Sequence, residues 1–204
     1  MENYIFPIRL EKELNFLLDN PEKIPSILCF HSIPAQGKTS FARYIAEKVS
    51  VNVDYFDCNS HLGDRHGASH IMTTINERRR TMSLTIDDGK VFNRCFILDE
   101  FHNLSKQRQD GYKVTFDNIL DYDGKFKNKN LVIICLNTDD RNTLRKTLTP
   151  AIYSRCHSIR FDILQSEKEE IINRAIDHYS DLDPEIIKRN VPDWRFIHRA
   201  IQMC

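Results

Sequence analysis

The sequence has no long apolar run and no closely spaced pair of cysteines. None of its apolar stretches approaches the ~20 residues that a membrane-spanning helix needs, so we expect no membrane partner. The first residues, Met1 to Pro7, lack the pattern of a secretory signal. The six cysteines include no Cys-x-x-Cys pair, and three of them lie in expected core strands. Together these absences predict a cytoplasmic protein with reduced cysteines.

A net charge is also absent, because 29 Lys and Arg residues balance 29 Asp and Glu residues. A surface that binds nucleic acid must therefore be a local patch. The triplet Arg78-Arg-Arg80 is a candidate for contact with DNA phosphates, although such a triplet usually lies on a solvated helix face. An apolar content of 41% is that of an ordinary globular protein, and 204 residues suit one domain with a small appendage.

One segment, FHSIPAQGKTS from Phe30 to Ser40, follows the apolar residues 27–30 and precedes an amphipathic stretch from Phe41 to Val49. This order predicts a buried strand, a tight loop that ends in Gly-Lys-Thr, and a helix, which is the layout of a phosphate-binding loop. Backbone N–H groups at the start of the helix would bind an anion. Lys38 would bind the β- and γ-phosphates of ATP, and Thr39 would bind Mg²⁺. The expected nucleotide-binding residues are Pro34, Ala35, Gln36, Gly37, Lys38, Thr39 and Ser40.

Two positions in this loop depart from the usual pattern. Ser32 stands where the full pattern has Gly, and Ala35 stands where many relatives have another Gly. Side chains at these positions fit the loop only if both residues avoid left-handed backbone angles. We therefore predict that neither residue is left-handed, and that the two substitutions weaken ATP binding without abolishing it.

Two adjacent acids, Asp99 and Glu100, follow the apolar residues 95–98. This pattern predicts a buried parallel strand with both acids at its carboxyl end, the edge at which open α/β sheets bind ligands. Asp99 would hold Mg²⁺, directly or through water, and Glu100 would orient and deprotonate the attacking water. Two such acids can also merely begin a turn. The phosphate-binding loop earlier in the chain favours the catalytic interpretation.

A third apolar strand is expected at 131–136, and it is followed by Asn137 and Thr138. A polar residue at the end of a central strand can position the nucleophilic water between the phosphate loop and the acids. The alternative is that Asn137 simply begins a turn, as Asn often does.

Five motifs, in this order along the chain, resemble those of AAA+ ATPases. They correspond to Walker A, Walker B, sensor 1, the Ser-Arg-Cys arginine-finger motif and sensor 2. The resemblance covers nearly the whole chain and is closest to the clamp-loader branch, which includes the replication factor C small subunits and their bacteriophage counterparts. The segments that carry it are 34–39, 98–101, 134–138, Ser154-Arg-Cys156 and Asp193-Trp-Arg195.

The resemblance implies a role for each polar motif residue. Asn137 would sense the γ-phosphate. Arg155 would reach the γ-phosphate of ATP bound to a neighbouring subunit, which would make hydrolysis depend on assembly. Arg195, on a helix of the lid, would contact the phosphates of the chain's own ATP. The alternative for both arginines is an ordinary solvated position on the surface.

The alternation of expected strands and helices predicts a parallel α/β sheet with helices on both faces. The resemblance implies a P-loop AAA+ three-layer αβα sandwich over residues 1–164, followed by a small helical lid over 165–204. Clamp-loader subunits normally carry a third, helical collar domain after the lid, and in a departure from that pattern we expect no collar domain in these 204 residues. Three residues are expected to begin helices in the second half of the chain as N-caps, namely Thr149, Ser166 and Asp193, and Asp183-Pro184 is expected to begin another.

These expectations favour an ATP-hydrolysing, Mg²⁺-dependent subunit of a DNA-replication assembly, of the clamp-loader type. Its partners would be other AAA+ subunits, a sliding clamp and primer–template DNA. One alternative is an ATPase that loads a helicase or initiates replication. Another is a nucleotide-dependent interaction subunit with little hydrolysis. A small-molecule kinase is disfavoured, since it does not need the acid pair, the sensor asparagine and both motif arginines together.

Three histidines, His61, His66 and His70, are close enough in sequence to suggest a metal site. No cysteine lies near them and their spacing matches no zinc pattern, so a metal site there is disfavoured.

Overall fold

The computed structural model describes residues 5–59, 67–81, 89–121, 129–138, 141–191 and 193–197. Within these ranges the chain forms one five-stranded sheet, and the order of its strands is β2-β3-β4-β1-β5. Every pair of neighbouring strands is parallel, as predicted. The strands are β1 (Ile27–Ser32), β2 (Ser50–Asp57), β3 (Phe92–Asp99), β4 (Asn130–Asn137) and β5 (His157–Arg160).

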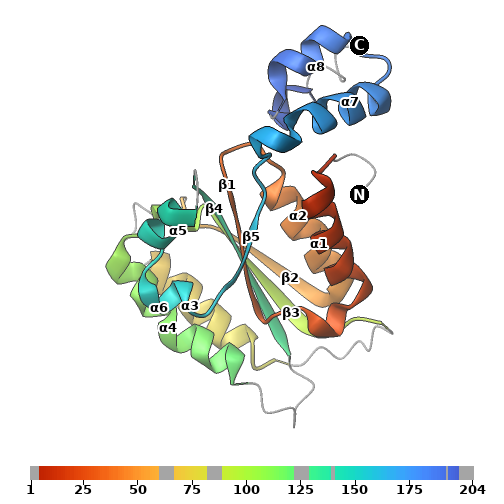
Figure 1. Cartoon of the computed structure of the whole chain (residues 1–204). Coiled ribbons are helices and arrows are strands. Elements are labelled where there is room, and N and C mark those ends of the chain that lie inside the picture. Colours follow the sequence, from red (N-terminus) through yellow and green to blue (C-terminus); the bar gives the residue numbers. More distant parts are fainter. Residues whose placement is uncertain are drawn as a thin grey trace.

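Helices cover both faces of this sheet and give the predicted three-layer αβα sandwich (Figure 1). On one face lie α1 (Ile8–Asp19) and α2 (Lys38–Val49), with the short helix η1 (Pro21–Lys23) after α1. The helices on the other face are α3 (Gly67–Arg78), α4 (Lys106–Leu120), α5 (Arg141–Thr147) and α6 (Pro150–Tyr153). None of the helices in the described ranges combines the length and apolar character that crossing a membrane requires.

The middle parts of the central strands β1, β3 and β4 are continuously apolar because both of their faces are covered. In β1, Leu28 and Phe30 pack into the cluster under α1 and α2, while Ile27 and Cys29 pack into the cluster under α3 to α6. Successive side chains of a strand point to opposite faces, so two separate cores need a continuous apolar run. The cysteines of the predicted strands, Cys29, Cys95 and Cys135, are buried and form no disulfide.

The C-terminal helical region comprises η3 (Gln165–Glu167), α7 (Lys168–His178), α8 (Pro184–Asn190) and the helical residues 194–197. Figure 1 shows α7 and α8 beyond one end of the sheet, above α1 and α2. The region has its own apolar core, to which Ile5 contributes a side chain from the opposite end of the chain. Two ion pairs join it to α1, Arg9 to Glu167 at 3.0 Å and Arg174 to Glu11 at 2.8 Å.

Most of the predicted helix starts are confirmed, but one is wrong. The side chain of Thr149 caps α6, and that of Asp183 caps α8. Asp193 Oδ1 accepts hydrogen bonds from the N–H groups of the next helical turn. Ser166, which was expected to cap a helix, lies inside η3 instead. The longer Glu167 side chain reaches back and accepts from the N–H of Leu164 at 2.9 Å, and Leu164 is the N-cap, two residues before Ser166.

The pattern of apolar residues predicts a strand over 53–57 and a helix over 110–120, but β2 and α4 both begin earlier. The expected strand began at Val53, but β2 begins at Ser50. The expected helix began at residue 110, but α4 begins at Lys106, where the Ser105 side chain accepts from the N–H of Arg108. Both added segments are mostly polar, so hydrophobic periodicity did not indicate them.

Candidate active site

The loop between β1 and α2 directs the first turn of α2 into a pocket. Gly37 precedes the helix in a left-handed conformation, with φ 79°, and Lys38 is the first helical residue. The N–H groups of a first helical turn have no partners within the helix, and the helix dipole adds positive charge there. This end of α2 can therefore bind an anion.

The prediction that Ala35 avoids a left-handed backbone is wrong, because its φ is 68°. Ser32 does avoid it, since it is the last residue of β1 and is fully buried. The loop joins β1 to α2 over residues 33–37 alone, and it makes this tight connection with left-handed residues at Ala35 and Gly37. A left-handed residue with a Cβ costs roughly 1–2 kcal/mol, so the loop is strained at Ala35.

The Lys38 ammonium is held by the loop itself in this ligand-free structure. Its Nζ donates to the Ser32 hydroxyl oxygen at 2.9 Å, to the Ile33 carbonyl at 2.9 Å and to the Ser32 carbonyl at 3.2 Å. Burial lowers the pKa of Lys38 from its ordinary value to about 8. A phosphate in the pocket would favour the charged ammonium and offset this cost of burial.

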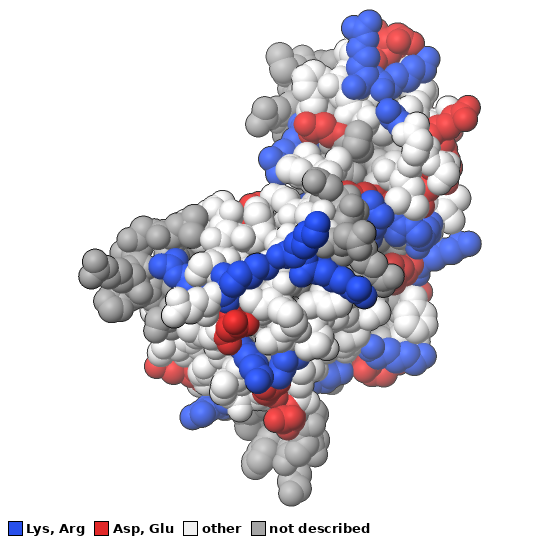
Figure 2. Space-filling view, turned by 60° about the vertical axis from the view of Figure 1, so that its left-hand side comes forward, with Lys and Arg blue, Asp and Glu red and all other residues white. Residues whose placement is uncertain are grey.

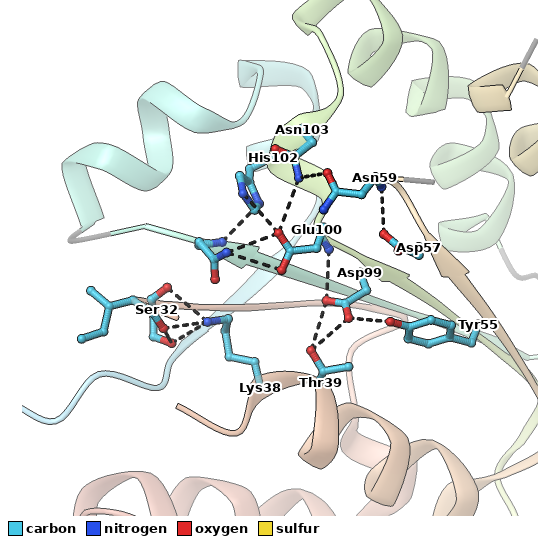
Figure 3. A network of polar contacts seen from close by, with 12 residues as sticks. Ser32, Lys38, Thr39, Tyr55, Asp57, Asn59, Asp99, Glu100, His102 and Asn103 are labelled. Carbon is cyan, nitrogen blue, oxygen red and sulfur yellow. Dashed lines mark hydrogen bonds and ion pairs between the residues drawn. The ribbon is translucent and has the colours of Figure 1, made fainter. Parts of the chain in front are cut away.

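The side-chain oxygens of Thr39 and Asp99, which are of the kind that bind metal ions, lie together at the carboxyl edge of the sheet (Figure 3). The Thr39 hydroxyl lies 3.1 Å from each carboxylate oxygen of Asp99. The Tyr55 hydroxyl, on β2, donates to Asp99 Oδ2 at 2.6 Å. Hydroxyl and carboxylate oxygens suit Mg²⁺, which usually keeps several waters and adds phosphate oxygens. The described residues contain no cluster of three His, Cys, Asp or Glu that could hold a metal, so Mg²⁺ would need such additional ligands here.

The Glu100 carboxylate faces the end of β4 (Figure 3). Asn137 Nδ2 lies 3.3 and 3.4 Å from its two oxygens. His102 Nε2 lies 3.4 Å and Asn103 Nδ2 lies 3.5 Å from Glu100 Oε2. Asn103 also donates to Asn59 Oδ1 at 2.6 Å. Glu100 itself is left-handed, with φ 55°, and this turn separates its side chain from that of Asp99.

A pocket with a volume of about 150 Å³ gathers residues from four parts of the chain. The phosphate loop contributes residues 35–40, β4 contributes Asn137, and Glu100 follows directly after β3. Trp194 and Arg195 come from the C-terminal helical region. Pro34 belongs to the same loop but is exposed and does not line this pocket. The predicted phosphate-binding residues and the predicted water-activating residues therefore share one cavity.

Arg155 is not among the residues that line this pocket. It follows α6 and forms a two-pronged ion pair with Asp117 on α4, through Nε to Oδ1 at 2.5 Å and Nη2 to Oδ2 at 3.0 Å. Its Nη1 donates to the Ala151 carbonyl at 2.6 Å. The hydrogen bond with the Asp117 carboxylate raises the pKa of Arg155 above its ordinary value, so the guanidinium remains positively charged. Its side chain is about one-fifth exposed.

Three residues that make contacts in the site lie outside the sequence motifs and were not predicted. His102 and Asn103 follow the acid pair after one intervening residue, Phe101, and that proximity was the available signal for them. Tyr55 lies far from Asp99 in sequence, and only the pairing of β2 with β3 brings them together.

The structure gives little support to two other candidates from the sequence, the histidine metal site and the arginine triplet. His61 and His66 lie outside the described residues, and His70 is exposed on α3. In the arginine triplet, Arg78 pairs with Asp54, and Arg79 donates to Asn76 and to the carbonyl of Asn118. Because Arg78 and Arg79 bond to other residues of the chain, a role in the fold is favoured for both over contact with DNA phosphates.

The family model described as "ATPase family associated with various cellular activities (AAA)" matches residues 28–162, which is more than half of the chain. The chain belongs to the AAA family. The matched segment begins in β1 and ends just after β5, so it contains the phosphate loop, the acid pair and Asn137 of this AAA chain.

Solved structures with a similar fold include variants of Thermotoga maritima RuvB. A Pro-to-Gly mutant has a TM-score of 0.60 and 18% identity, with 98% of this chain and 62% of that chain covered. A Thr-to-Val variant has a TM-score of 0.53 and 16% identity, with 88% and 54% covered. The AAA chain thus spans little more than half the length of these proteins, and at such identities the likeness concerns the fold alone. A search of the curated proteins found no match.

Proposed function

We propose that this AAA chain binds ATP with Mg²⁺ and hydrolyses it as one subunit of a larger assembly. The observation that carries the proposal is the single pocket that contains the first turn of α2, Glu100, Asn137 and Arg195. Phosphoryl transfer is catalysed mainly by positioning and by neutralising charge, and these groups are of the kinds that both tasks need.

In this proposal the N–H groups of the loop and Lys38 bind the phosphates. Thr39 and Asp99 would hold Mg²⁺, which when bound neutralises charge on the phosphate oxygens. Glu100 orients the attacking water and accepts its proton, and Asn137 holds that water near the γ-phosphate. The 3.3 Å approach of Asn137 Nδ2 to the Glu100 carboxylate supports a shared task for these two side chains.

We further propose that Arg155 acts on the ATP of a neighbouring subunit. Its guanidinium is charged and partly exposed, yet it does not line the pocket of its own chain. An arginine supplied by a partner is worth about 10³–10⁵-fold in turnover in nucleotide hydrolases. Hydrolysis would then require two subunits in contact. Arg195, by contrast, would contact phosphate in its own chain and link the nucleotide to a lid formed by residues 165–204.

The clamp-loader task is proposed from the Ser154-Arg-Cys156 motif together with a basic face. Figure 2 brings the side of the molecule that carries α4, α5 and α6 forward, and Lys and Arg side chains form a band across its middle. A local band of this kind suits DNA phosphates in a protein without net charge. Basic residues on these elements include Lys106, Lys113, Arg145 and Lys146, which are exposed. We propose that its partners are primer–template DNA, a sliding clamp and further AAA subunits. We also propose that it acts in the cytoplasm.

A second candidate function is a nucleotide-dependent interaction subunit with little hydrolysis. The left-handed Ala35 and the internal hydrogen bonds of Lys38 favour it, since both raise the cost of opening the loop for phosphate. The intact pair of Glu100 and Asn137 favours hydrolysis instead.

The test is the steady-state ATPase rate per subunit against protein concentration, with and without primer–template DNA. We expect the rate to rise with concentration and with DNA, and Lys38→Ala to abolish ATP binding. A rate per subunit that is independent of concentration would remove the role of assembly. ATP binding without turnover under every condition would favour the interaction subunit.

A further inference from the structure

We propose that His102 is a positioning residue that holds the Glu100 carboxylate against Asn137 through an imidazole protonated at Nε2. The inference rests on the proposed function, because Glu100 is the base of the proposed hydrolysis. His102 lies outside the five sequence motifs.

The backbone places His102 between Glu100 and the end of β4. The left-handed Glu100 turns the chain into the short helix η2 (Phe101–Asn103). Phe101 is fully buried in the core under α3 to α6 and packs edge-on against the Tyr112 ring at 5.3 Å. With the preceding residue anchored in this way, the start of η2 is fixed, and His102 lies beside both Glu100 and Asn137 (Figure 3).

The two ring nitrogens of His102 have different partners, and this assigns the tautomer. The backbone N–H of Asn137 donates to Nδ1 at 3.3 Å, so Nδ1 must carry a lone pair. Nε2 lies 3.4 Å from Glu100 Oε2. In a neutral imidazole one nitrogen donates and the other accepts, so the proton is on Nε2 and faces the carboxylate. Burial also lowers the pKa of His102, which favours the neutral ring.

This geometry lets one ring connect the backbone of β4 to the proposed base. Asn137 and Asn103 donate long hydrogen bonds of 3.3 and 3.5 Å to Glu100, and His102 Nε2 lies 3.4 Å from the same carboxylate. Such bonds are weak singly, and the position of the carboxylate depends on several acting together. His102 lines an adjacent open groove with Asn137 and does not line the nucleotide pocket. It would therefore act through Glu100 and not on ATP.

The first experiment separates turnover from binding in assembled wild-type and variant protein. We expect His102→Ala to lower kcat by about 10- to 100-fold with KM for ATP nearly unchanged, because a misplaced base slows the reaction but does not weaken binding. His102→Gln can present an amide N–H where Nε2 lies and should recover part of kcat. His102→Asn can replace only Nδ1 and should recover less. His70→Ala, an exposed histidine on α3, is the matched control and should behave as wild type.

The double variant Glu100→Gln with His102→Ala tests the route of the effect. If His102 acts through Glu100, the second change should add little to the loss from the first. Independent, multiplying losses would overturn the proposal, as would a loss that appears mainly in KM.

A second readout does not require activity. Nitrogen-15 NMR of histidine-labelled protein, with the signal of His102 assigned by its loss in His102→Gln, should show a protonated Nε2 and an unprotonated Nδ1 at neutral pH. A ring protonated at Nδ1 would contradict the inference even if the ATPase is active. If no condition yields hydrolysis, the proposed function fails, and the NMR result still decides whether His102 donates to Glu100.

Discussion

The nucleotide pocket and the end of α6 differ in how much of the proposed chemistry one chain completes. At the pocket, the phosphate loop, Glu100, Asn137 and Arg195 converge from distant parts of the sequence. At the end of α6, Arg155 pairs with Asp117 of α4 and does not line that pocket. Both regions carry a motif arginine, but only Arg195 lies where it can contact the chain's own phosphates.

The difference teaches that position in the fold, and not residue type, decides which motif arginine lines the pocket of its own chain, and it underlies the different roles proposed for Arg195 and Arg155. A single subunit holds groups for phosphate and water, and a further positive charge would have to come from a second subunit. In the structure the Arg155 guanidinium pairs with the Asp117 carboxylate, and under the proposed function it would exchange this partner for the phosphate of a neighbouring subunit. The following changes break or sharpen the comparison, from the largest expected effect to the smallest.

Arg155→Ala should lower turnover in the assembly by about 10³-fold or more while leaving the ATP affinity of a single subunit unchanged. The sharper form mixes Arg155→Ala subunits with Glu100→Gln subunits. A pocket with intact Glu100 can then receive Arg155 from its neighbour, so the mixture should recover activity that neither variant has alone. Arg189→Ala, which removes an exposed arginine on α8, is the control. A mixture without recovery would assign Arg155 no role across the interface.

Glu100→Gln should lower kcat by about 10²–10⁴-fold, because the amide cannot accept the proton of the attacking water. Binding of a fluorescent ATP analogue should persist, since the amide keeps one acceptor oxygen for Asn137. Glu47→Gln, which changes an exposed acid on α2, should have no effect. Turnover at the wild-type rate would show that Glu100 is not the base.

Arg195→Ala should weaken ATP binding by about 10-fold, the value of a charge-assisted hydrogen bond to phosphate. Unlike Arg155→Ala, this loss should appear in isolated subunits, and titration calorimetry at low protein concentration measures it. Arg189→Ala, on the exposed side of α8, is the comparison. Unchanged affinity would place Arg195 with the solvated arginines despite its position in the pocket.

Tyr55→Phe should raise the Mg²⁺ concentration needed for half-maximal ATP binding by about fivefold, because one hydrogen bond contributes roughly 1 kcal/mol to the placement of Asp99. A Mg²⁺ titration of nucleotide binding measures the shift, and ATP binding without Mg²⁺ serves as its reference. An equal loss with and without Mg²⁺ would indicate that Tyr55 acts on the fold and not on Asp99.

Ala35→Gly should stabilise the protein by about 1 kcal/mol, which corresponds to a rise in Tm of about 2–4 °C. Glycine accepts the observed φ of 68° without the strain of a Cβ. Ala46→Gly, the same change inside α2, should instead destabilise the protein by about 1 kcal/mol or more. Thermal unfolding distinguishes the two, and a lower Tm for Ala35→Gly would mean that the loop gains from a less flexible residue.

The local chain pattern was enough for the fold class and for the strand ends that form the site. The apolar runs before Ser32, Asp99 and Asn137 require burial on both faces, and parallel strands bring their carboxyl ends to one edge. The sequence alone therefore places the phosphate loop, the acid pair and Asn137 together at this edge of the sheet. It did not reach the start of α4 or the start of η3, where polar side chains and not periodicity decide the boundary.

The sequence by itself therefore determined the layers, the parallel sheet and the types of residue at its functional edge, because hydrophobic periodicity and short motifs are local properties. Only the tertiary structure decided that Ala35 is left-handed, that Tyr55 supports Asp99 and that His102 joins Asn137 to Glu100. It also decided that Arg195 enters the pocket while Arg155 pairs with Asp117. Each of these depends on how elements distant in sequence pack together, and no local pattern encodes such contacts.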